Sequence, residues 1–232
     1  LESNIDKIED SNISSASTDF YLAETYLYLS FIEVIFNDRL SAYWDFRKAY
    51  KLVEKNIDNH PEFYPNYKTL ALINTIIGSI PQEHKWLPNL LGFEGNIDLA
   101  AQHYKSASLH SPLLTTECYL YNALSQSIIL KNTLDTKNNF PNEENVIKSN
   151  GYLFVTGFIY THTNQPKEAL KALNQIPKSI SNQYTTFIYY LTGDCNLSLV
   201  NYDAAITNFN KFLKVNMSPN HIKSTQYKLF CA

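Results

Sequence analysis

Apolar residues recur at spacings of three and four along most of the chain, which is typical of amphipathic α-helices. The segment TTFIYYLTGDCNLSLVNYDAAITNFNKFLKV holds two such patterns, separated only by "VN". In the second pattern Ala205, Phe209 and Phe212 share one helix face. Because the connection is so short, we expect two antiparallel helices packed side by side.

Small residues mark this helix pair and the one before it. Gly157 precedes Ala169 by twelve residues, and Gly193 precedes Ala205 by twelve, so the two units are 36 residues apart. Small side chains let two helix backbones approach closely, and we expect Phe209 to fill the space beside them. Both units resemble tetratricopeptide repeats, whose period is about 34 residues.

The second helix of such a repeat recurs twice upstream, with a small–aromatic–small spacing of four and then three residues. The first helices of these two repeats are expected at DFYLAETYLYLSFIEVIF and YPNYKTLALINTIIG. In the first of these segments, Glu33 occupies a position that is usually aromatic. The residues with this spacing are Ala42, Phe46 and Ala49 in one helix and Ala100, Tyr104 and Ala107 in the other.

The pattern predicts an all-α fold of antiparallel helix hairpins, stacked as a right-handed superhelix in one domain over residues 1–232. The repeat-like units are expected at about 20–56, 64–112, 150–180 and 184–217. The same spacing occurs in other arrays of α-hairpins, which is the alternative to the tetratricopeptide family.

Two insertions interrupt the repeats, at about 81–95 and 132–142. The first is rich in apolar residues, so we expect it to pack as a short helical plug over the mouth of a hairpin; an exposed docking patch is the alternative. Its predicted residues are Trp86, Leu87, Leu90, Leu91 and Phe93 for packing, Gly92 and Gly95 for chain reversals, and Asn96 as a helix cap.

The second insertion, at about 132–142, is polar. We expect a surface loop with Asn142 capping the next helix, or a linker between two sub-bundles.

Residues 64–130 resemble the tetratricopeptide repeat protein 39 family and its fungal mitochondrial outer-membrane relative. The family implies a helical repeat scaffold without enzymatic activity. This chain lacks most of the family's length and has a bacterial-looking composition, so membrane and lipid-droplet roles are not expected here. The matching residues are Ile80, Pro81, Leu90, Leu91, Gly92, Phe93, Gly95, Leu99 and Ala107.

Composition narrows the function classes. The 232 residues are 44% apolar with a net charge of −3, so the chain should fold, and it lacks the basic stripe of a nucleic-acid-binding protein. No run of eighteen apolar residues indicates a membrane span. We expect a soluble protein of the bacterial cytoplasm or periplasm. The chain starts at Leu1 and ends inside a helical pattern, so we expect a trimmed sequence, and the removal of a signal peptide or an anchor stays open.

The sequence holds no recognised catalytic or metal-binding motif. Its six histidines show no pair at i, i+4, and its three cysteines, Cys118, Cys195 and Cys231, form no C-x-x-C, so we expect buried free thiols. The Asp and Glu residues are expected to be solvated. We therefore predict that the protein is not an enzyme and uses no cofactor or metal.

Solenoids bind partners along the concave face that their first helices line. This face is expected to be aromatic with little charge, and to bind a peptide or partner helix as a non-catalytic scaffold. The alternatives are a small-ligand or glycan binder of a bacterial envelope, an enzyme or the helical accessory part of one, or aromatics that only pack between helices. The predicted positions are Phe154, Phe158, His162, Phe187, Tyr190 and Asp194, with Glu24, Leu27 and Phe31 in the first unit.

Overall fold

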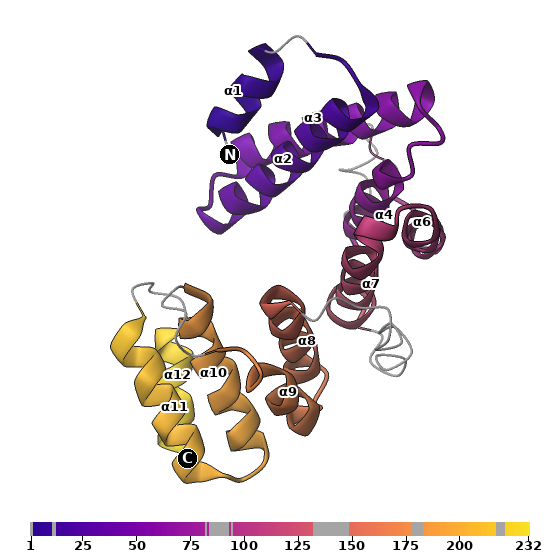
Figure 1. The fold of residues 1–232 in the computed structure, drawn as a ribbon. Helices are drawn as coiled ribbons and strands as arrows, with labels where there is room; N and C mark the ends of the chain where they lie inside the picture. The colour runs from indigo at the N-terminus through magenta and orange to yellow at the C-terminus, as the bar shows by residue number, and fades with distance from the viewer. Residues whose placement is uncertain are drawn as a thin grey trace. The chain divides into compact units, whose positions relative to one another are not determined.

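The computed structural model describes residues 2–10, 13–81, 83, 93, 95–131, 149–177, 183–216 and 221–232, with the side chains of 183–185 left aside. Within these ranges the secondary structure is entirely helical, with eleven α-helices, one 3₁₀-helix and one π-helix (Figure 1). The predicted all-α class is confirmed. The chain forms two compact units, residues 1–122 and 123–232. The predicted single superhelical domain stays a prediction.

Unit 1 consists of two long helix pairs with a short helix before them and another after them. The pairs are α2 with α3 and α4 with α6, as the sequence predicted (Figure 1). The helices are α1 (Glu2–Asp10), α2 (Ala16–Ile35), α3 (Arg39–Asn59), α4 (Pro65–Gly78), α6 (Ile97–His110), the 3₁₀-helix η2 (Pro112–Leu114) and α7 (Thr115–Leu124), which crosses the boundary of the unit.

Unit 2 contains two further sequential pairs, α8 with α9 and α10 with α11, and α12 packs on α10 and α11. Both pairs were predicted. The elements are the π-helix η3 (Ser125–Ile129), α8 (Asn150–His162), α9 (Pro166–Leu173), α10 (Gln183–Ser198), α11 (Tyr202–Val215) and α12 (Ile222–Cys231).

Local capping explains where several helices start. The Asn96 side chain accepts a hydrogen bond from the backbone N–H of Leu99 at 3.1 Å, which confirms the predicted cap of α6. Pro166 opens α9, where its missing N–H costs no hydrogen bond. Asn142 lies outside the described residues, and the cap of α8 is Ser149.

Close contacts at glycine set the spacing of both pairs in unit 2. A Cβ atom added to Gly157 would come within 2.5 Å of the Leu173 side chain, and one added to Gly193 within 2.6 Å of Phe209. Leu173 and Phe209 stand 36 residues apart, as the two glycines do, so the same contact is built twice. Ala169 and Ala205 are fully buried in the same pairs.

The upstream small–aromatic–small residues also lie in helix interfaces. Ala49 and Ala107 are fully buried, and Tyr104 is buried beside Ala100. Phe46 is half-buried against the core of the first pair. Ala42 is buried as well, so the small residues of both signatures face inward.

Phe93, near the end of the first insertion, packs against α3. It is buried, and its ring makes edge contacts with Tyr43, Phe46 and Tyr50 of α3, at centroid distances of 6.1, 5.5 and 5.4 Å. Such edge-to-face pairs stabilise aromatic cores beyond their buried area. Phe93 therefore packs into the core, as the plug interpretation expects. The other predicted plug residues, Trp86, Leu87, Leu90, Leu91 and Gly92, lie outside the described residues.

The structure also bears on the predictions about the cysteines and about membrane spans. Cys118 and Cys195 are buried free thiols, but Cys231 is exposed at the end of α12, so the prediction is wrong there. In the part of the chain that the structure describes, no helix combines the length and the apolar character needed to cross a bilayer.

Replacing Gly157 by alanine tests the close approach of α8 and α9. Alanine favours the helix by about 1 kcal/mol, but the added methyl would overlap buried Leu173, and overpacking costs about 1–3 kcal/mol. We expect Gly157→Ala to lower the free energy of unfolding by about 1 kcal/mol in urea titrations. Gly151→Ala is the matched control, because its added Cβ would meet only Ser149 Oγ at 3.8 Å. A Gly157→Ala variant as stable as the native chain would contradict the contact.

Replacing Glu33 tests a carboxylate that departs from the repeat pattern. Burial, and then the negative charge of Asp45, raise the pKa of Glu33 above its ordinary value. Its ionised form therefore destabilises the fold above the folded pKa, and the penalty fades as the pH falls and the group is protonated. We expect Glu33→Gln to raise the free energy of unfolding at pH 7 by about 0.5 kcal/mol, and by less at pH 4.5. A gain that grows toward low pH would contradict the assignment.

Candidate functional site

A groove of about 610 Å³ lies in unit 1 between α2, the start of α4 and the segment that leads into α7. Its walls are mostly aromatic and apolar, and its floor carries charged side chains. The lining residues are Ser17, Phe20, Tyr21, Glu24, Thr25, Tyr28, Phe63, Pro65, Lys68, Ser111, Pro112, Leu113, Leu114 and Glu117.

Helix periodicity brings the polar groups of the floor together. Glu24 and Tyr28 are four residues apart on α2, so they share one face of that helix. Glu117 and Tyr121 have the same spacing on α7. Lys68 lies in the first turns of α4, which begins at Pro65. Each of the three helices therefore contributes polar side chains to one point.

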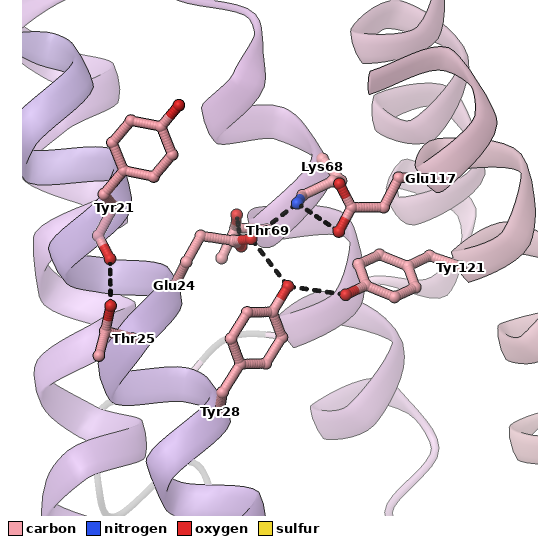
Figure 2. A network of polar contacts seen from close by, with 8 residues as sticks. All are labelled: Tyr21, Glu24, Thr25, Tyr28, Lys68, Thr69, Glu117 and Tyr121. Atoms are coloured by element: carbon pink, nitrogen blue, oxygen red, sulfur yellow. Dashed lines mark hydrogen bonds and ion pairs between the residues drawn. The ribbon is translucent and has the colours of Figure 1, made fainter. Parts of the chain in front are cut away.

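Lys68 is the centre of this network, as Figure 2 shows. Its Nζ atom lies 2.6 Å from Glu24 Oε2 and 3.1 Å from Glu117 Oε1. The side chain of Lys68 is only 2% exposed and that of Glu24 10%, whereas that of Glu117 is 36% exposed. One buried ammonium group thus links two carboxylates from different helices, and Glu117 is the carboxylate that solvent reaches.

Two hydroxyl groups also donate hydrogen bonds to the Glu24 carboxylate (Figure 2). Tyr28 Oη donates to Glu24 Oε2 at 2.9 Å, and Thr69 Oγ1 donates to the other carboxylate oxygen, Oε1. Tyr28 and Tyr121 also share a hydrogen bond of 2.7 Å between their hydroxyl groups. Both oxygens of the buried carboxylate are therefore satisfied, which a buried charge requires.

The surroundings of Lys68 and Cys118 shift the pKa of both side chains. Burial alone would lower the pKa of Lys68, but Glu24 and Glu117 outweigh it and raise that pKa, so the ammonium form persists. The Phe20 and Tyr121 rings lie 5.4 Å from its Nζ and favour the same charge. Burial also raises the pKa of the neighbouring Cys118 thiol to about 12, which keeps it protonated. What the groove offers a ligand is fixed charge and aromatic surface.

The structure separates the predicted first-helix positions of unit 1. Glu24 lies at the groove, whereas Leu27 is fully buried in the core. Phe31 lines a second, apolar groove of about 570 Å³ together with Tyr43 and Phe46 of α3. The expectation that acidic residues are solvated is wrong for Glu24, because Lys68 pairs with it.

Two charged residues that line this groove, Lys68 and Glu117, lie outside the predicted first-helix positions. Neither was predicted, because lysine and glutamate are usually exposed. One signal could have found Lys68. It shares a helix face with Ala71 and Thr75, which are three and seven residues further on and are both buried.

In unit 2 the predicted aromatics come together on α8 and α10. Phe187 lies 6.2 Å from Phe154 and 6.4 Å from Phe158, and Phe158 contacts His162 at 4.1 Å, all between ring centroids. Phe187 also stacks on Tyr190 at 5.5 Å. These residues therefore form one aromatic cluster across the two first helices.

Tyr190 and Asp194 are already engaged by α12. Lys228 Nζ lies 2.6 Å from Asp194 Oδ1, donates to Tyr190 Oη at 2.9 Å and stands 4.6 Å from the centre of the Tyr190 ring. Tyr190 is only 7% exposed. At this end of the cluster the packing alternative describes the contacts, because a helix of the same chain occupies them.

Metal-binding residues do not gather in the described ranges, where no group of three His, Cys, Asp or Glu side chains could hold an ion. Comparison with protein-family models, curated proteins and solved structures finds no match for this chain. The observations therefore establish an all-helical protein with sequential helix pairs. The resemblance to tetratricopeptide repeat families stays a prediction.

Replacing Lys68 tests whether the floor is a true buried ion pair. Lys68→Met would leave Glu24 unpaired in the interior, which costs about 3–5 kcal/mol of unfolding free energy. Lys48→Met is the matched control. Lys48 also pairs with a glutamate, Glu9, but its side chain is 48% exposed, so we expect a loss below about 1 kcal/mol.

A double variant separates lost pairing from lost packing. Glu24→Leu combined with Lys68→Met leaves no unpaired charge between α2 and α4, so it should be more stable than Lys68→Met alone. Chemical denaturation measures all three variants. Equal losses in Lys68→Met and Lys48→Met would contradict the buried pair.

Proposed function

We propose that this protein is a non-catalytic scaffold that binds a peptide or a partner helix in the groove of unit 1, and that its helix pairs are repeats of the tetratricopeptide type. The observation that carries the proposal is the groove itself. The first helices of two successive pairs, α2 and α4, line it together with the start of α7. Binding along first helices is the usual mode of helical repeat arrays.

The rim of the groove supports a protein partner. Leu113 is 98% exposed and Tyr21 is 61% exposed, and both line the groove. Exposed apolar residues beside a concave surface are typical of interaction sites, and tyrosine is enriched among residues that dominate binding energy. The volume of about 610 Å³ can receive several side chains of a bound segment.

The floor supports binding with little rearrangement. Its carboxylate, ammonium and hydroxyl groups hold one another at hydrogen-bond distances before any ligand arrives. A surface that is ordered beforehand loses less conformational entropy on association. The floor therefore fixes the shape of the groove, and the rim supplies the contact area.

Selection from a phage-displayed library of random 12-residue peptides tests this proposal. We expect peptides to be enriched on the full chain, and Tyr21→Ser to weaken their binding about tenfold, because it removes an aromatic contact at the rim. Tyr227→Ser is the control, since Tyr227 is 70% exposed on α12 and is not one of the residues that line the groove. Circular dichroism checks that both variants keep their helical content.

Two results would overturn the proposal. One is a library from which no peptide is enriched on the native chain. The other is enriched peptides that bind Tyr21→Ser and the native chain equally well.

A further inference from the structure

We infer that the groove of unit 1 recognises a lysine or arginine side chain, carried by a partner segment with apolar neighbours. This inference rests on the proposed function, and it adds the chemistry of the ligand. It follows from the charge of the floor, from the apolar walls and from two contacts that the chain makes within itself.

The floor holds one more negative charge than positive. Glu24 and Glu117 are both carboxylates, and Lys68 is the single ammonium group between them. Lys68 is almost fully buried, so its charge is directed to its two partners and little of it reaches the groove opening. An anionic ligand would have to approach both carboxylates, whereas a cation lowers the electrostatic energy of the site.

Glu117 is the group that a cation can reach. Its side chain is 36% exposed and lines the groove, whereas the side chain of Glu24 is 10% exposed and has both carboxylate oxygens engaged. Aromatic rings of Phe20, Tyr21 and Phe63 line the same groove. A groove that holds both a carboxylate and aromatic rings suits an ammonium or guanidinium group, because a ring face within reach of the cation adds a cation–π attraction.

The chain uses this combination to hold its own terminal helices. Lys228 of α12 contacts Asp194 and the face of Tyr190, as described above. At the other end, Lys48 of α3 pairs with Glu9 of α1 at 2.9 Å and stands 4.2 Å from the centre of the Tyr26 ring. In each case a lysine ammonium group contacts a carboxylate and a tyrosine of neighbouring helices: both lie on α10 for Lys228, whereas they lie on α1 and α2 for Lys48.

The apolar walls define the rest of the ligand. Pro112, Leu113 and Leu114 form one side of the groove. The methylene stem of a lysine or arginine packs on apolar surface while its charged end reaches a polar group. The partner segment should therefore place apolar residues around its basic residue, with the charge directed at Glu117.

The test uses the peptides enriched in the library experiment, whose selection is blind to charge. We expect lysine or arginine in most of the peptides that depend on Tyr21. Synthetic peptides with that residue exchanged for glutamine should bind the native chain about fivefold more weakly. This arm needs no change in the protein, so it does not depend on the folding of a variant.

A variant of Glu117 tests the expected ion pair between this carboxylate and the basic residue of the peptide. Glu117→Gln should weaken the lysine peptide about fivefold and the glutamine peptide by clearly less, because only the lysine peptide loses a charge pair. Glu168→Gln, on the exposed surface of α9, alters the net charge equally and should change neither affinity. The lysine peptide should also bind more weakly as salt rises, because ions screen the pair.

The outcomes separate the two proposals. Peptides that depend on Tyr21 but lack a basic residue, or are acidic, would overturn the inference and leave the proposed function standing. The same holds if Glu117→Gln and Glu168→Gln have equal effects on the lysine peptide. Absence of any Tyr21-dependent peptide would overturn the proposed function itself.

Discussion

The ammonium group of Lys68 lies in the interior of unit 1, where two carboxylates and two aromatic rings surround it. A buried charge is tolerated only when its partners are close and well oriented. Those partners come from α2 and α7, so the position of Lys68 on α4 constrains both neighbouring helices. This contact joins the three helices at the floor of the groove, where two carboxylates face one ammonium group.

The helix pairs of the fold could be predicted because their causes are local. The spacing of apolar residues, the short connections and the small residues at Gly157 and Gly193 lie within each pair of helices. Asn96 is a similar case, since an N-cap acts on the next three residues. The structure adds the partner of each glycine, Leu173 and Phe209, which repeat at the same interval.

The site could not be predicted in the same way. Whether Lys68 is buried depends on Glu24 and Glu117, which come from other helices far away in the sequence. Periodicity places a residue on a helix face, but it does not say which distant charge will meet it. Tyr190 and Asp194 show the same limit, because a lysine of α12 engages residues that were expected to face a partner.

The protonation of Lys68 is the most direct measure of this account, and ¹⁵N NMR of the lysine Nζ groups between pH 7 and 12 reports it. The ion pairs raise the pKa of Lys68, so their contribution to stability is complete below the ordinary lysine value of about 10.4 and is lost as the pH rises through the folded value. The account predicts that the Lys68 signal is protected from exchange and titrates above that ordinary value. Titration at or below it would show that the carboxylates do not compensate for burial, and would contradict the account.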